Sequence, residues 1–141
     1  MQHYPGQYSE GLATGGKLVV SRDEWFIQYY FSGPDLRYNG SIVEIKSGEV
    51  PSFIDGLNAN WERFEELRGK IPEDGDFSVL GECNMMIRVG GFAEGVCIRG
   101  YNGAMASREE IEATVQTFRY AIERAAAVQQ MLSELDPEGC A

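Results

Sequence analysis

Histidine is nearly absent from this chain, and its scarcity narrows the available chemistry. His3 is the only histidine among 141 residues, and it precedes the first hydrophobic segment. Imidazole is the commonest general base and metal ligand, so the folded core is expected to lack both. The sequence also has no Gly-x-Ser-x-Gly turn of the kind that presents a catalytic serine. We therefore expect a non-catalytic protein with no cofactor and no metal.

Cysteine is scarce as well. Cys83, Cys97 and Cys140 form an odd set, and no two of them have the Cys-x-x-Cys spacing of a zinc site or a redox dithiol. Cys83 and Cys97 lie in apolar segments, so they are interpreted as small buried side chains, and Cys140 as an exposed free thiol. A disulfide between Cys83 and Cys97 across neighbouring strands is the alternative.

Long hydrophobic runs and an export signal are missing. No uninterrupted apolar segment approaches the roughly 18 to 20 residues that a membrane span requires. The N-terminus has no positively charged segment followed by an apolar one. These features predict a cytoplasmic protein that does not associate with membranes.

Positive charge is in short supply. The chain has 12 Lys and Arg residues against 22 Asp and Glu residues, which gives a formal net charge of -10 at pH 7. Such a surface repels the phosphates of nucleic acids at long range, so direct nucleic-acid binding is not expected. It favours encounter with a basic protein, which we take as the expected partner.

The apolar patterns begin after a glycine-rich start. Residues 1–16 have little periodicity and are predicted to form a flexible leader, and residues 17–141 are predicted to form a single domain. Gly11–Lys17 fits the first seven positions of a phosphate-binding loop, but Leu18 replaces the required hydroxyl residue. A strand is expected to follow instead of a helix, so nucleotide binding is not predicted.

Strand patterns occupy most of the remaining chain. Residues 17–31 are β-branched and aromatic with alternating apolar positions, and Asn39-Gly40 predicts a hairpin turn before residues 42–45. Residues 77–89 alternate apolar and polar side chains and are predicted to form one half-buried strand. Gly90-Gly91 then turns the chain into a neighbouring strand at residues 96–99.

Two segments carry helical periodicity. Residues 53–67 place apolar side chains at steps of three and four, with Pro51 in the first turn and Gly69 just past the end. Ser107 and Glu110 form a capping-box pattern that begins a C-terminal helix of roughly 25 residues or more. The order β-β-β-β-α-β-β-α predicts an α+β fold with an antiparallel sheet of about five to six strands. The long C-terminal helix is expected to pack on this sheet, and a coiled-coil dimer is the alternative.

Two surfaces are candidates for partner contact. One is an acidic ridge on the first helix, continued by the Pro72–Asp76 loop, which lacks the spacing of a calcium loop and is otherwise a solvated turn. The other is the polar face of the 77–89 strand with its neighbour, where Arg, Tyr and Met side chains are typical of protein contacts. The candidate partner-binding residues are Glu62, Glu65, Glu66, Glu73, Asp74, Asp76, Glu82, Arg88, Arg99 and Tyr101.

These observations favour a small acidic protein-binding domain. Its general character is that of bacterial immunity proteins, which neutralise a toxin or another basic partner protein. One alternative is a small-molecule-binding protein or enzyme with a carboxylate-lined pocket. Another is a structural subunit of an assembly that is held through the C-terminal helix. The sequence is compatible with a monomer or a homodimer.

Overall fold

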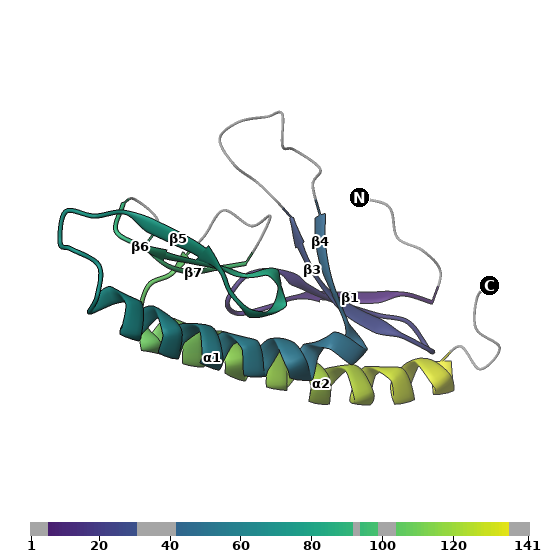
Figure 1. Cartoon of the computed structure of the whole chain (residues 1–141). Helices are drawn as coiled ribbons and strands as arrows, with labels where there is room; N and C mark the ends of the chain where they lie inside the picture. Colours follow the sequence, from purple (N-terminus) through teal and green to yellow (C-terminus); the bar gives the residue numbers. More distant parts are fainter. Residues whose placement is uncertain (1–5, 31–41, 92–93, 99–103, 136–141) are drawn as a thin grey trace.

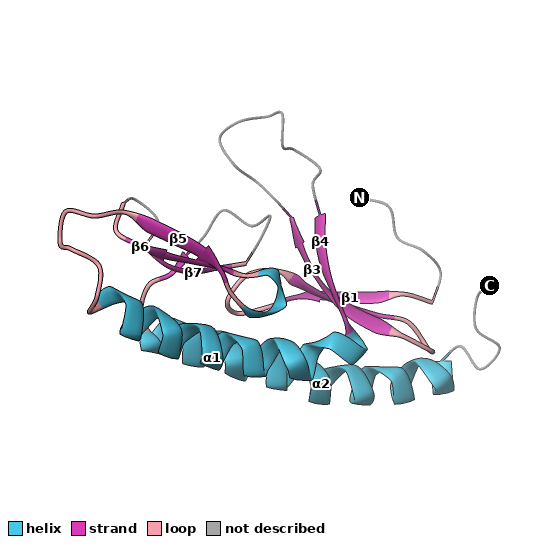
Figure 2. Cartoon of the chain, viewed as in Figure 1, coloured by secondary structure: helices cyan, strands magenta, loops and turns pink. Residues whose placement is uncertain are grey.

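Two antiparallel sheets lie side by side on a layer formed by two helices (Figures 1 and 2). The computed structural model describes residues 6–30, 42–91, 94–98 and 104–135. Within these residues each sheet has four strands. The α+β class is confirmed, whereas the expected sheet of five to six strands is replaced by eight strands in two sheets.

The first sheet contains β1 (Tyr8–Gly11), β2 (Lys17–Val20), β3 (Trp25–Tyr30) and β4 (Ile42–Lys46), in that order. Leu18, Ile27 and Ile45 lie opposite one another in a single buried row. Successive residues of a strand point to opposite faces, so this row forms the side of the sheet that packs on the core. β3 and β4 pair antiparallel, as a hairpin requires, and the Asn39-Gly40 turn lies outside the described residues.

The segment expected to be a flexible leader contributes a strand. β1 pairs along its length with β2, and Gly15 and Gly16 adopt the positive φ angles that the connecting turn requires. Glu10 fixes β1 to the long C-terminal helix, because its carboxylate accepts hydrogen bonds from Tyr120 and Arg124, both at 2.8 Å. These partners lie more than a hundred residues away in the sequence, so the local pattern does not reveal them.

The second sheet contains β5 (Phe77–Leu80), β6 (Met86–Val89), β7 (Gly95–Cys97) and β8 (Ala104–Met105), in that order. The prediction of one strand over 77–89 is wrong, because a 3₁₀ turn, η3 (Glu82–Asn84), divides it into β5 and β6. Val79 pairs with Ile87, so odd-numbered side chains point to the same face in both strands. The alternation of apolar and polar residues is therefore the same on both sides of the turn, as it would be in one continuous strand.

Both predicted helices are confirmed. α1 (Val50–Arg68) follows a 3₁₀ turn, η2 (Ser47–Glu49), and has proline in its first turn and Gly69 at its C-terminal cap. α2 (Arg108–Leu135) is capped at its N-terminus by Ser107, whose hydroxyl accepts the Glu110 N–H at 3.2 Å. α1 contacts β6 and β7, whereas α2 contacts β2, β8 and α1. No helix of the described residues has the length and apolar composition to cross a membrane.

A single core joins the two sheets. Phe118 of α2 lies against Tyr29 of β3 and Phe53 of α1, with ring centroids 6.5 Å and 5.5 Å apart. Such edge-to-face and tilted arrangements stabilise aromatic pairs beyond their apolar burial. The same buried cluster includes Ile87 and Val96 of the second sheet. Removal of either sheet would therefore expose core residues of both helices.

Candidate functional site

The acidic side chains predicted on α1 are exposed, but two of them are paired. Glu62, Glu65 and Glu66 all face solvent. Glu65 lies 3.3 Å from the Arg108 guanidinium, and Glu66 lies 3.0 Å from the Lys70 ammonium. These ion pairs offset part of the negative charge, so the acidic ridge on α1 is less negative than its carboxylates alone would make it.

The acidic loop lies between α1 and β5. Glu73, Asp74 and Asp76 are all exposed, and the Gly75 N–H donates to the Pro72 carbonyl oxygen at 2.8 Å. The predicted solvated turn is therefore present. Among the described residues, no group of three His, Cys, Asp or Glu side chains is arranged to hold a metal ion.

The polar sheet face is composed differently from the prediction. Glu82 belongs to η3, so it does not share the sheet face with Arg88. Arg88 instead lies in a cross-strand row with Ser78 and Gly95. The remaining predicted residues of this face, Arg99 and Tyr101, lie outside the described residues.

The edge strand β5 has unusually exposed apolar side chains. Within the described chain β5 pairs only with β6, so its other side is an open edge (Figure 1). Leu80 is 53% exposed and Phe77 is 39% exposed. The strand sequence Phe-Ser-Val-Leu contains neither the lysine nor the proline that commonly protects a sheet edge from pairing.

Acidic residues stand at both ends of this edge. The loop with Glu73, Asp74 and Asp76 precedes Phe77, and Glu82 follows Leu80 after one residue. We call these six residues the β5 surface. Sequence reasoning found the four acids and missed Phe77 and Leu80. The available signal was Leu80 itself, which is apolar at an even position where the alternation expects a polar side chain.

The turn at the end of β5 is held by a buried amide. Asn60 of α1 is 1% exposed, and its side chain hydrogen-bonds both the N–H and the carbonyl of Glu82. The turn is tight, because Cys83 and Asn84 adopt φ angles of 55° and 60° that are uncommon for residues other than glycine. This contact fixes β5 and Glu82 relative to α1.

Cys83 is the central residue of this turn and lines a cleft of about 400 Å³ that Glu44 and Glu49 also line. The prediction that Cys83 is buried is wrong, because its side chain is exposed, whereas Cys97 is buried as expected. Neither cysteine forms a disulfide, so the alternative of a Cys83–Cys97 bridge is also wrong. Desolvation, together with the charges of Glu82, Glu49 and Asp55, raises the pKa of Cys83. A raised pKa disfavours the thiolate, so this cysteine is poorly suited to nucleophilic catalysis.

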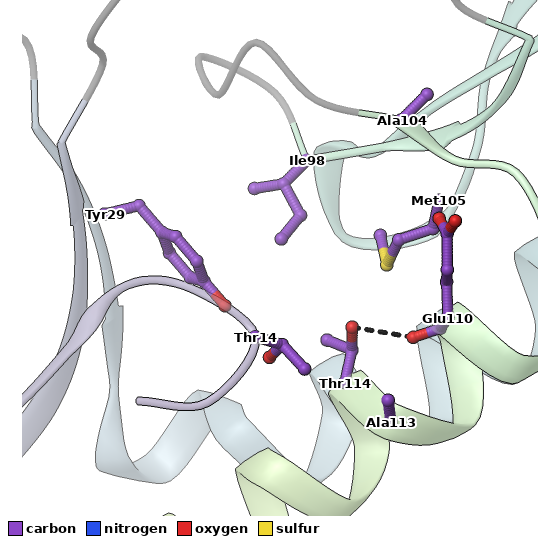
Figure 3. Close-up of a pocket in the computed structure, with 8 residues that line it drawn as sticks. All are labelled: Thr14, Tyr29, Ile98, Ala104, Met105, Glu110, Ala113 and Thr114. Carbon is purple, nitrogen blue, oxygen red and sulfur yellow. Dashed lines mark hydrogen bonds between the residues drawn. The ribbon is translucent and has the colours of Figure 1, made fainter. Parts of the chain in front are cut away.

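A second concavity lies between the sheets. It has a volume of about 230 Å³ and is formed by the 12–16 turn, β3, β8 and the first turns of α2, with Ile98 just past β7 (Figure 3). Its walls are mainly apolar, and the Glu110 carboxylate stands at its side near Met105 (Figure 3). It lies near β8, at the opposite edge of the second sheet from β5.

Comparisons with protein-family models, curated proteins and solved structures give no significant match to this chain.

Proposed function

We propose that this protein is a non-catalytic binding domain that contacts a basic partner protein through the β5 surface. The observation that carries the proposal is an open sheet edge with two exposed apolar side chains and acidic residues at both ends. Exposed apolar residues of this kind, when polar groups surround them, are typical of protein contacts.

The chemistry of the edge suggests how a partner would bind. An extended segment can add to β5 through main-chain hydrogen bonds, in the manner of strand addition. Leu80 and Phe77, which point to opposite faces of the sheet, would then pack against apolar side chains on the two faces of that segment. Lysine or arginine residues on either side would lie near Glu82 and the acidic loop. A partner with a basic-flanked extended segment or an exposed basic edge strand meets these requirements.

The overall negative charge also supports a basic partner protein. A protein of net charge -10 is steered toward a positively charged surface, and this accelerates association at low salt. An inhibitor of the immunity type, which covers the basic surface of a toxin or nuclease, would use these properties. The raised pKa of Cys83 disfavours nucleophilic chemistry at this thiol.

The test uses the full chain to recover its partner from the native host and then measures affinity by calorimetry. Leu80→Lys should weaken binding at least about tenfold, because it removes an apolar contact and opposes basic side chains. Reversal of Glu73, Asp74 and Asp76 to lysine should weaken binding and flatten its dependence on salt.

Leu135→Lys is the matched control, since Leu135 is 74% exposed at the C-terminal end of α2. It should bind like the unaltered protein. Unchanged affinity in both β5 variants would exclude the β5 surface as the contact. Loss of binding in Leu135→Lys alone would favour an assembly subunit that is held through the C-terminal helix.

A further inference from the structure

The pocket between the two sheets has no role in the proposed protein contact. It is bordered by β8, whereas the β5 surface lies at the other edge of that sheet. Parts of the chain that are distant in sequence enclose it, namely Thr14, Tyr29, Ile98 and Met105 with the start of α2 (Figure 3). The site therefore requires a separate explanation.

The walls of the pocket favour an apolar body. Ile98 enters from above, the Tyr29 ring stands at one side, and Met105 stands at the other (Figure 3). Ala113 on α2 forms part of the floor and leaves space that a larger residue would fill. A volume of about 230 Å³ lies below the roughly 300 Å³ at which pockets for drug-sized ligands begin, so it suits a single ring or a short alkyl chain.

Glu110 and Thr114 present hydrogen-bond acceptors at this pocket, whereas Thr14 and Tyr29 bring further hydroxyl groups to its lining. Thr114 donates its hydroxyl proton to the Glu110 carbonyl oxygen at 2.9 Å, which leaves the hydroxyl oxygen to accept. The Glu110 carboxylate accepts the Ala106 N–H at 3.0 Å, and a carboxylate has capacity for several further bonds. A ligand therefore needs a hydrogen-bond donor beside the Glu110 carboxylate, and a positive charge on that donor would strengthen the contact.

We propose that this pocket binds a small primary amine with an apolar body. The ammonium group would contact the Glu110 carboxylate at the rim, where Glu110 remains exposed to solvent. The apolar body would occupy the space between Tyr29, Ile98 and Met105. This division keeps the charge in water and removes the apolar surface from it.

The experiment compares benzylamine with benzyl alcohol, which differ at the group that would face Glu110. Methyl NMR spectra of the full chain should show shifts of Ile98, Met105, Ala113 and Thr114 with either probe. Benzylamine should bind about tenfold more tightly, because a charge-assisted hydrogen bond is stronger than a neutral one. Equal affinities would overturn the assignment of an amine.

Two variants and their controls test the location. Ala113→Leu should abolish binding by filling the pocket, whereas Ala126→Leu, an exposed alanine of the same helix, should not. Glu110→Gln retains a residue that suits the helix start and should bring benzylamine to the affinity of benzyl alcohol. Glu112→Gln should leave the preference for benzylamine intact.

Three results would overturn the proposal. One is the absence of shifts in the pocket methyl groups at millimolar benzylamine, and another is full binding by Ala113→Leu. The third is a preference for benzylamine that survives Glu110→Gln. This last variant also keeps the test decisive if Ala113→Leu fails to fold.

Discussion

The side-chain amide of Asn60 pairs with the main chain of Glu82. Asn60 Nδ2 donates to the Glu82 carbonyl oxygen at 3.1 Å, and the Glu82 N–H donates to Asn60 Oδ1 at 2.8 Å. The pair joins the middle of α1 to the turn that carries one end of the β5 surface. Asn60 is buried and both bonds are partly buried, so loss of the amide is costly.

Asn60→Ala is expected to lower the free energy of unfolding by about 2 to 4 kcal/mol, because it leaves two main-chain groups of the turn without their partner. Urea denaturation followed by circular dichroism measures the change. Asn58→Ala is the control, since Asn58 is exposed on the same helix, and it should change stability by less than about 0.5 kcal/mol. Equal effects of the two substitutions would contradict the role of the amide.

Gly81→Ala is expected to destabilise the same contact from the other side. An added Cβ would overlap Asn60 Oδ1 and lie 3.0 Å from Cδ1 of Ile87. We expect a loss of at least about 2 kcal/mol, as for overpacking in a core. Gly48→Ala is the matched control, because an added Cβ there meets nothing within 4 Å. Comparable denaturation midpoints for the two variants would show that the turn can move away.

Local patterns predicted the helices because their signals lie within the elements themselves. Ser107 and the apolar steps of α2 specify where that helix starts and which face is buried. The sequence did not reveal that 77–89 is divided into two strands, because the apolar residues stay at odd-numbered positions on both sides of the turn, as the paired Val79 and Ile87 show. β1 escaped because its stabilising partner, α2, lies at the other end of the chain.

The candidate site was predictable only in part. Composition indicated acidic residues near β5, and the Pro72–Asp76 loop is exposed as expected. The open edge was not predictable, because strand order depends on which strands pair across the whole chain. Cys83 illustrates the same limit, since its exposure follows from a turn that Asn60 holds from another element.

The two described thiols should differ in alkylation. Cys83 is exposed and should react with iodoacetamide in the native protein, whereas Cys97 is buried and should react only after unfolding. Desolvation and nearby carboxylates raise the pKa of Cys83, so its rate near neutral pH should be below that of a free cysteine. Peptide mapping by mass spectrometry separates these sites from Cys140.

Glu82→Gln provides the charge test for Cys83. Removal of a carboxylate that raises the pKa of this thiol should increase the thiolate fraction, and therefore the alkylation rate, near neutral pH. Glu62→Gln, on an exposed part of α1, should leave the rate unchanged. An identical rate in the Glu82 variant would mean that the charge of Glu82 does not contribute to the raised pKa of this thiol.

Glu10 should make stability depend on pH in the acidic range. Desolvation raises the pKa of this carboxyl, but hydrogen bonds from Arg124, Tyr120 and Tyr8 outweigh it, so the net pKa lies below the ordinary value of 4.5. A carboxyl with a lowered folded-state pKa stabilises the fold above its unfolded pKa and loses that contribution as pH falls through the folded value. Glu10→Gln should therefore be less stable than the unaltered protein at about pH 7, and the difference should shrink below about pH 4.5.

Thermal unfolding of both proteins across this range measures the effect. Glu112→Gln, at an exposed position of α2, is the control and should follow the unaltered protein at every pH. The lower stability of Glu10→Gln at neutral pH is expected because the ionised carboxylate accepts hydrogen bonds from all three donors at once, at 2.8 to 2.9 Å. A stability difference between the Glu10 variant and the unaltered protein that stays constant down to about pH 3 would show that the charge of Glu10 does not hold β1 on the helix.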